Sequence, residues 1–382
     1  MARKNEIITA ADTVDTLPEY YSYDAIMKIP AIYRMIIGQR SNGKTYGWCG
    51  LGLDHYFSDG LPSAYVRRLD EMIKPSIIGG LFDPHLDYIQ ERSGGRYNGI
   101  EYRGHEWHLV RREKNKLDKL VTVDKDPQAF CRSYSVNTVE TTKGVDYGEI
   151  WSICYDEFIT RAYYLTNEFV MFQNLLSSLI RKRPGVNIFM LANTVSKHCP
   201  YFAEMGLYRI RRQEQGTIDI YKIGKTSDQI AVEYCAQVGA AKKVASYFAF
   251  DNPQLEMITS GAWELALYRH APEGLADHKI LLSFFIQIDG HTIQGDVIQY
   301  KTYPLIFFHP KTTEIKYPEK SIIYAQNAAD GNPLHQRDLT MCFTRAQIII
   351  RDLIKSQKTF YSDNETGESV AAWLRPMHLA AR

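Results

Sequence analysis

The strongest constraint on this chain is an apolar run that leads directly into a turn containing two glycines and a lysine. Residues 32–37 read IYRMII, as expected of a buried strand, and residues 38–45 read GQRSNGKT, which fits the pattern G-x-x-x-x-G-K-[ST]. Gly38 and Gly43 allow the backbone to curl until successive N–H groups point inward, and a following helix adds its positive N-terminal end. The pattern therefore predicts a phosphate-binding loop between a strand and a helix.

Two side chains of this loop have the chemistry to act on a nucleotide. The Lys44 ammonium is expected to contact β- and γ-phosphate oxygens, and the Thr45 hydroxyl to ligate Mg²⁺. The expected nucleotide-binding residues are Gly38, Gln39, Arg40, Ser41, Asn42, Gly43, Lys44, Thr45 and Tyr46. Residues 115–118 spell N-K-x-D, a string found in guanine-reading loops, but they lie in a charged segment with no apolar strand leading into it. We therefore expect ATP, with Mg²⁺, as the ligand.

An acidic strand end supplies the second half of such a site. Residues 149–158 read EIWSICYDEF, an apolar strand that ends in two carboxylates. Asp156 is expected to hold Mg²⁺, and Glu157 to orient and deprotonate the attacking water. A second carboxylate of this kind favours an ATP-driven motor over a kinase, which must exclude water. The alternative interpretation is a strand followed by a solvated acidic turn.

Three arginines and one asparagine are candidates for contacts with the γ-phosphate. Arg40 lies in the loop itself, and Arg181 and Arg183 lie at a helix end, where they could stabilise the charge that develops on the phosphate. A basic helix end also complements the helix dipole without any catalytic role. Asn193 ends the apolar strand 187–193 and could hydrogen-bond the γ-phosphate or the attacking water, or simply begin a turn.

Alternating periodicities predict an α/β unit followed by a smaller α+β unit. Further strands are expected at 61–68, 105–110 and 120–123, and a helix at 167–181. This alternation predicts a parallel sheet with crossover helices. Residues 226–261 have a helical pattern, with 231–249 rich in Ala and Lys, as in a lid or linker. Beyond it, a hairpin is expected from 280–288 and 292–300, a third strand at 305–308 and a last helix at 344–358.

Length and composition limit the class of protein. A chain of 382 residues is long enough for two domains, and we place an ATPase domain at 1–225, the helical linker at 226–262 and the α+β domain at 263–382. A formal net charge of +1 excludes strong attraction of the whole chain to nucleic acid, so contacts with a polyanion require local clusters. The six cysteines form no C-x-x-C pair, and neither a secretory signal nor an apolar run of about 18 residues is present, so a cytoplasmic protein without zinc is expected.

Several strings around these motifs point to one family. The chain carries SYDAI at 22–26, YVRR at 65–68, YDEFI at 155–159, LAN at 191–193 and PYF at 200–202. In order and approximate spacing, together with the phosphate loop, they resemble the DNA encapsidation ATPases of small podophages with protein-primed linear genomes, which are relatives of the large terminases. The resemblance is clear over residues 20–205 and fainter through the hairpin at 280–300.

The resemblance implies a fold, an activity and a set of partners. It implies an ASCE-type phosphate-loop domain followed by an RNase H-like domain without the nuclease metal cluster. It also implies a homo-oligomeric ring, in that family a pentamer, which docks on the portal of an empty procapsid in the host cytoplasm and drives double-stranded DNA inward with ATP. Arg181 and Arg183 both match the arginine that one subunit supplies to its neighbour, and residues 22–26 match a segment near the adenine. Some members dock through a capsid-bound RNA, which the sequence does not decide.

The contacts with DNA should be independent of base sequence, because a packaging motor must pass every base pair of a genome. The basic residues available for such contacts are Arg111, Arg112, Lys114, Lys116, Lys119, Arg209, Arg211, Arg212, Lys242 and Lys243. Asp289 lies at a turn and Asp296 has no evident acidic partners, so cleavage of DNA is not expected. The alternatives are a large terminase with an active nuclease, and a nucleotide-dependent assembly or switch protein without translocation.

Overall fold

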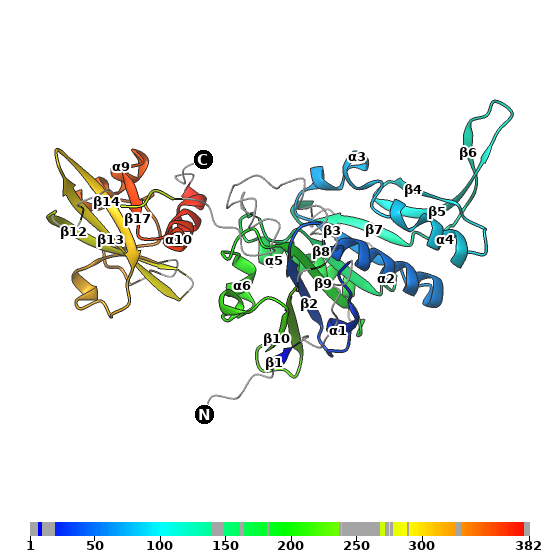
Figure 1. Cartoon of the computed structure of the whole chain (residues 1–382), viewed down its shortest axis with the longest axis horizontal. Helices are drawn as coiled ribbons and strands as arrows, with labels where there is room; N and C mark the ends of the chain where they lie inside the picture. The colour runs from blue at the N-terminus through cyan, green and yellow to red at the C-terminus, as the bar shows by residue number, and fades with distance from the viewer. Residues whose placement is uncertain are drawn as a thin grey trace. The chain divides into compact units, whose positions relative to one another are not determined.

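The chain forms two compact units, residues 1–264 and residues 265–382. The computed structural model describes residues 7–9, 20–138, 148–160, 164–181, 183–236, 238, 268–271, 275, 278–288, 290–325, 328 and 330–377. Each unit has its own sheet and its own hydrophobic core (Figure 1).

A mixed sheet organises the first unit. Its strands run in the order β1-β10-β11-β2-β9-β8-β3-β7-β5-β4, with β6 paired to β5. The strands are β1 (Ile7–Thr9), β2 (Tyr33–Gly38), β3 (Ser63–Arg67), β4 (Gly99–Arg103), β5 (Glu106–Lys114), β6 (Leu120–Lys125), β7 (Cys131–Ser135), β8 (Ser152–Asp156), β9 (Asn187–Asn193), β10 (Thr217–Lys222) and β11 (Gln229–Tyr234). Neighbours from β11 to β7 pair in parallel, and antiparallel strands extend both edges.

Helices cover both faces of this sheet. The helices are α1 (Asp24–Met27), α2 (Lys44–Asp59), α3 (Pro75–Ile78), α4 (Leu86–Arg92), α5 (Glu168–Ile180) and α6 (Pro200–Glu204). On one face, Trp48 and Leu53 of α2 pack against Phe189 of β9. On the other, Phe172 and Leu176 of α5 pack in the core formed by alternate residues of the same strands. The predicted α/β architecture with crossover helices is confirmed.

The strand order decides which side chains meet. The phosphate-loop strand β2 and the acidic strand β8 are not neighbours, because β9 lies between them and pairs in parallel with both. Parallel strands bring their carboxyl ends to one edge of the sheet, where ligands of open α/β folds bind. Gly38 of β2 pairs with Asn193 of β9, and Asp156 of β8 pairs with Leu191 of β9. The three chain segments therefore end side by side.

One sequence-based expectation about this unit is wrong. Residues 229–234, the start of the expected helical linker, form β11, which pairs in parallel with β2. Ile230, Val232 and Tyr234 contribute to one core cluster and Ala231 to the other, so both faces of the strand are buried. Burial on both faces of the sheet outweighs the helical composition, and the sheet of the first unit extends beyond the expected boundary at 225. Residues 239–249 of the expected helix lie outside the described residues.

The second unit is a sheet with helices on one face. Its strands run in the order β16-β15-β12-β13-β14-β17, and the described part of the unit also contains helices α9 and α10. The elements are β12 (Ile280–Ile288), β13 (His291–Tyr300), β14 (Tyr303–Pro310), β15 (Ile322–Ala325), β16 (His335–Gln336), α9 (Arg345–Lys355), β17 (Thr359–Tyr361) and α10 (Asn364–Leu374). Ile350 of α9 and Trp373 of α10 pack with Phe284 and Phe308. The predicted hairpin, third strand and helix at 344–358 are confirmed, but that helix is not the last one, because α10 follows it.

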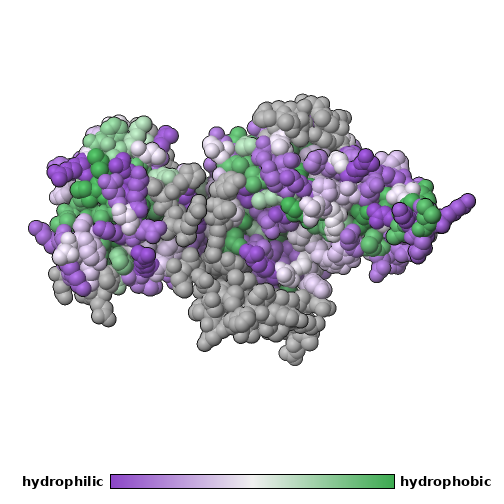
Figure 2. All heavy atoms as spheres, turned by 90° about the horizontal axis from the view of Figure 1, so that it is seen from above, coloured by the Kyte–Doolittle hydropathy of each residue, from purple (hydrophilic) through white to green (hydrophobic). Residues whose placement is uncertain are grey.

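The β5–β6 hairpin is the segment that sequence reasoning offered first for DNA contacts. Arg111 is paired with Glu113 at 2.8 Å and Lys114 with Asp118 at 2.9 Å. The hairpin also exposes four aliphatic side chains, those of Leu117, Leu120, Val121 and Val123. In Figure 2 the right-hand end of the molecule, where the hairpin projects, accordingly shows green patches beside purple ones. Because Arg111 and Lys114 form ion pairs within the hairpin, part of the hairpin's positive charge is compensated.

Candidate nucleotide-binding site

The phosphate loop has the conformation that its motif predicts. β2 ends at Gly38 and α2 begins at Lys44, so the loop lies at a helix N-terminus. Gly43 has a φ of 90°, a left-handed conformation that favours glycine. At Gly38 a Cβ atom would lie 2.8 Å from the Cβ of Cys235, so a side chain there would displace β11's end from the loop. Both glycines are therefore required by the geometry.

Lys44 is buried and held by the loop itself. Its Nζ donates to the carbonyl oxygen of Gln39 at 2.8 Å, to Oδ1 of Asn42 at 3.0 Å and to Oδ1 of Asn193 at 3.2 Å. Burial lowers the pKa of this ammonium, against the opposing effect of the Asp156 carboxylate. These acceptors are neutral oxygens, so none of them balances the positive charge of the Lys44 ammonium. A buried ammonium in this state fits an anionic group such as a phosphate.

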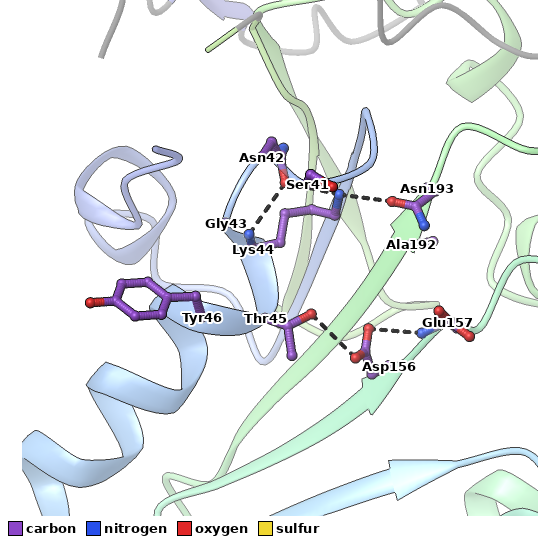
Figure 3. A pocket seen from close by; sticks show the side chains of 10 residues that line it. All are labelled: Ser41, Asn42, Gly43, Lys44, Thr45, Tyr46, Asp156, Glu157, Ala192 and Asn193. Atoms are coloured by element: carbon purple, nitrogen blue, oxygen red, sulfur yellow. Dashed lines mark hydrogen bonds between the residues drawn. The ribbon is translucent and has the colours of Figure 1, made fainter. Parts of the chain in front are cut away.

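A cavity of about 250 Å³ opens in front of this lysine. Figure 3 shows Lys44 pointing toward Asn193, and Thr45 pointing toward Asp156. The residues that line the cavity are Ser41, Asn42, Gly43, Lys44, Thr45, Tyr46, Asp156, Glu157, Ala192 and Asn193. The loop, the acidic strand end and the end of the strand between them thus share one cavity.

The floor of the cavity is a cluster of oxygen atoms around Asp156. Oδ2 of Asp156 accepts from the Thr45 hydroxyl at 3.2 Å and from the Tyr65 hydroxyl at 2.9 Å, and Oδ1 accepts from the backbone N–H of Glu157 at 3.0 Å. Hydroxyl and carboxylate oxygens suit Mg²⁺, which keeps several ligands from water or substrate phosphates. Within the described residues, no group of three or more His, Cys, Asp or Glu side chains could hold a metal. The Thr45 hydroxyl and the Asp156 carboxylate fit a Mg²⁺ ion that takes its other ligands from water and phosphates.

Glu157 faces the cavity but is engaged by an arginine. Its side chain is half exposed, and its Oε2 forms an ion pair with Nη2 of Arg67, whose Nη1 donates to the Tyr65 hydroxyl at 3.2 Å. Glu157 also has a φ of 57°, a left-handed conformation that is uncommon outside glycine. Arg67 ends β3, the strand next to β8. Sequence reasoning did not assign Arg67 to the site; its signal was the pair of arginines that ends a strand in the YVRR string.

Three other loop residues predicted to bind the nucleotide are Gln39, Arg40 and Tyr46. Arg40 is exposed and does not line the cavity. Gln39 is buried, and its side-chain amide has no hydrogen-bond partner within the described part of the chain. The Tyr46 ring stacks on the imidazole of His85, with centroids 4.2 Å apart. Of these three residues, Tyr46 lines the cavity and Gln39 and Arg40 do not.

The two candidate trans-acting arginines lie away from the cavity of their own chain. Arg181 follows the last residue of α5, is exposed and has a φ of 40°. Arg183 donates from Nη1 to the carbonyl oxygen of Gly148. Neither lines the cavity. A role for either arginine in catalysis stays a prediction.

Two tyrosines tie the segment before β2 to the phosphate loop. The Tyr23 hydroxyl donates to the carbonyl oxygen of Lys44 at 2.6 Å, and the backbone N–H of Tyr21 donates to the carbonyl oxygen of Asn42 at 2.8 Å. The Tyr21 hydroxyl donates to Glu233 at 2.7 Å, and burial raises the pKa of Glu233 to about 7. Residues 22–26 are thus held beside the loop, and their proximity to an adenine stays a prediction.

The remaining candidate residues lie in the first unit, in the second unit or outside the described residues. Arg209 forms a long ion pair with Asp219 at 3.9 Å. In the second unit, Asp296 is buried and accepts from Ser283 at 2.6 Å, from Gln294 at 2.9 Å and from His309 at 3.0 Å. None of these three partners is a carboxylate, so these hydrogen bonds do not bring a second acidic group to Asp296. Asp289, Lys242, Lys243 and the side chain of Arg211 lie outside the description.

Among the described helices, none combines the length and apolar character needed to cross a bilayer. This agrees with the sequence, in which no apolar run of about 18 residues occurs.

Comparisons with known proteins converge on one family. Residues 112–221 match the model of the podovirus DNA encapsidation protein (Gp16) family. This matched region contains the acidic strand β8, helix α5 and strand β9. A search of curated protein sequences finds no match.

Two solved structures resemble the whole chain. The bacteriophage phi-29 genome packaging motor assembly aligns with a TM-score of 0.57 at 15% identity and covers 95% of this chain and 100% of that chain. The phi-28 gp11 DNA packaging motor aligns with a TM-score of 0.53 at 15% identity, over 95% of this chain and 99% of that chain. Both units therefore have counterparts of similar fold. The family match and the likeness of fold confirm the predicted resemblance: over residues 112–221 this chain is similar to the podovirus DNA encapsidation proteins, and its fold is similar to that of two packaging motors.

Proposed function

We propose that this protein is an ATP-driven translocase that packages double-stranded viral DNA into a procapsid through the portal. The observation that carries the proposal is the single cavity in which the phosphate loop meets Asp156, Glu157 and Asn193. The family match and the two packaging motors of similar fold also support the proposal. By the same resemblance we propose a homo-oligomeric ring, a pentamer, that works in the host cytoplasm while attached to the procapsid.

The side chains of the cavity divide the chemistry of ATP hydrolysis among them. Lys44 supplies a positive charge for the β- and γ-phosphate oxygens, and Thr45 and Asp156 hold Mg²⁺. When bound, Mg²⁺ neutralises charge on the phosphates. Glu157 accepts the proton of the attacking water at its carboxylate, and Asn193 hydrogen-bonds the γ-phosphate or that water. Because the Glu157 carboxylate forms an ion pair with Arg67 in this structure, we propose that the pair opens before Glu157 accepts the proton.

A ring explains the position of the arginines at the end of α5. Arg181 is exposed and absent from the lining of its own cavity, as expected of a group that completes the site of the next subunit. Arg183 has the same relation to the cavity and stays the alternative. We propose Arg181 as the trans-acting cation.

Mixing two inactive variants tests this assignment. Arg181→Ala and Lys44→Ala subunits are each expected to be inactive alone, but a mixed ring contains junctions where an intact Lys44 faces an intact Arg181. Partial recovery of ATPase activity is therefore expected, measured on assembled motors over a series of mixing ratios. The same series with Arg183→Ala serves as the comparison. If assembly is intact and no mixture recovers activity with Arg181→Ala, this arginine does not act in trans.

The proposed function is tested by ATPase and packaging assays on portal-bearing procapsids, with and without double-stranded DNA. DNA is expected to stimulate ATP hydrolysis and to become protected from nuclease inside the capsid. Hydrolysis without stimulation or protection would favour a nucleotide-dependent assembly switch. Nicking of the DNA in Mg²⁺ or Mn²⁺ would favour a terminase with an active nuclease. DNA of unrelated base sequences should be packaged equally, because the expected contacts are to phosphates.

A further inference from the structure

We propose that the buried ion pair of Arg68 and Glu168 positions Glu157, by anchoring the turn that carries it to the start of α5. The inference rests on the proposed role of Glu157 in ATP hydrolysis. Arg68 follows β3, and Glu168 is the first residue of α5, 100 positions further along the chain. Neither residue lines the nucleotide cavity, so any effect on catalysis acts through other groups.

The arginine holds the backbone on both sides of the turn. Its Nε donates to Oε2 of Glu168 at 2.8 Å, its Nη2 to the carbonyl oxygen of Phe158 at 2.7 Å and its Nη1 to the carbonyl oxygen of Glu157 at 3.4 Å. The guanidinium presents several donors in a fixed plane, so one side chain fixes three acceptors together. Glu157 has a φ of 57°, a conformation that persists only where the surroundings impose it. Arg68 is the side chain that ties both carbonyls of this turn to a second element.

The glutamate is equally constrained. Its Oε1 accepts from the hydroxyls of Tyr155 at 2.7 Å and Tyr201 at 3.1 Å, and its Oε2 also accepts from the backbone N–H of Leu165 at 2.8 Å. Tyr155 precedes Asp156 on β8, so the network reaches the strand that supplies both acidic residues of the cavity. The side chains of Arg68 and Glu168 are 4% and 2% exposed, and a fully hydrogen-bonded charge pair at such depth permits little movement.

The network also connects two parts of the proposed mechanism. Helix α5 begins at Glu168 and ends at Ile180, directly before Arg181. The same helix is thus fastened to the turn of Glu157 at one end and carries the proposed trans-acting arginine at the other. A change in the conformation of the turn at Glu157 is therefore transmitted through Arg68 and Glu168 to helix α5, which ends directly before Arg181.

Substitution of Arg68 by lysine tests the proposal, because the positive charge is kept while the planar set of donors is lost. The expected result for the full-length Arg68→Lys protein on procapsids with DNA is a kcat lower by about 100-fold, the loss typical of a misplaced reacting group, with KM and nucleotide affinity within a few-fold of wild type. Tyr201→Phe removes only one hydrogen bond to Glu168, and we expect a fall in kcat of several-fold without loss of folding.

Arg34 offers a matched control in the same unit. It is buried and donates to the carbonyl oxygens of Ile26 at 3.3 Å and Ile29 at 2.9 Å and to Asn187 at 2.7 Å, at the end of β2 opposite the phosphate loop. Arg34→Lys should lower the unfolding temperature by a similar amount and leave kcat per folded subunit unchanged. Equal kcat in Arg68→Lys and Arg34→Lys would overturn the positioning role while wild-type activity stands. Absence of ATP turnover in the wild-type protein would overturn the proposed function and this inference together.

Discussion

Glu157→Gln is expected to bind ATP as the wild-type protein does and to hydrolyse it about 1,000-fold more slowly. The amide has the shape of the carboxylate but cannot accept the proton of the attacking water, and a general base of this kind contributes roughly 10²–10⁴-fold to a rate. Glu157 forms no part of the contacts that hold Lys44, so the affinity for nucleotide should be kept. Steady-state ATPase assays and the binding of a fluorescent ATP analogue measure the two effects separately.

Glu149→Gln is the control for this prediction. Glu149 is an exposed carboxylate in the segment that leads into β8, so the variant has the same change in net charge close to the same strand. Its rate should equal that of the wild-type protein. Turnover at the wild-type rate in Glu157→Gln would remove Glu157 from the chemical step and leave the acidic turn as a structural feature.

Lys44→Ala is expected to reduce ATP turnover to background, a loss of at least about 1,000-fold, and to weaken nucleotide binding. The side chain is the buried cation of the cavity, and its loss leaves phosphate oxygens without the charge that a preorganised site supplies. Because burial already lowers the pKa of this ammonium, the charged group does not favour the folded state, and the variant should remain folded. ATPase rates, nucleotide titrations and thermal unfolding check the three parts of the expectation.

Lys74→Ala is the matched control, since Lys74 is an exposed lysine of the same unit that does not line the cavity. It should hydrolyse ATP at the wild-type rate. Measurable DNA-dependent turnover by Lys44→Ala motors would mean that the phosphate loop is not the place where ATP is hydrolysed.

Local patterns were sufficient to predict the loop and the acidic strand end. Gly38, Lys44 and Thr45 belong to one continuous segment whose strand and helix are part of the motif, so no knowledge of distant contacts was needed. Asp156 and Glu157 were recognisable because they end an apolar run. Their meeting in one cavity depends on the strand order, which a resemblance to a known family could suggest but local periodicity could not.

The contacts that sequence reasoning missed join residues far apart in the chain. Arg67 pairs with Glu157 across 90 positions and Arg68 with Glu168 across 100, because β3 and β8 are neighbours in the sheet. A similar reason explains the error at β11. Residues 229–234 contain Ile230, Val232 and Tyr234, which favour a strand, and pairing with β2 on one side and β10 on the other fixes the extended conformation.

The basic hairpin shows that counting charges in the sequence overestimates the positive charge that is left unpaired. Five basic residues between 111 and 119 predicted a phosphate-binding surface, yet Arg111 and Lys114 are paired with acidic residues of the same hairpin. Arg112 donates to the carbonyl oxygen of Ile100 at 2.7 Å. Within the described residues, Arg112, Lys116 and Lys119 form no ion pair, and a role for the hairpin in DNA contacts stays a prediction.

The most direct test of the central claim is an experimental structure of the assembled protein with Mg²⁺ and a non-hydrolysable ATP analogue. We expect the triphosphate to lie in the phosphate loop, with the Lys44 ammonium moved from the Gln39 carbonyl onto phosphate oxygens, and Thr45 and Asp156 to lie around the same Mg²⁺ as the nucleotide. A loop without nucleotide at saturating analogue, or a nucleotide bound away from Asp156 and Glu157, would contradict it.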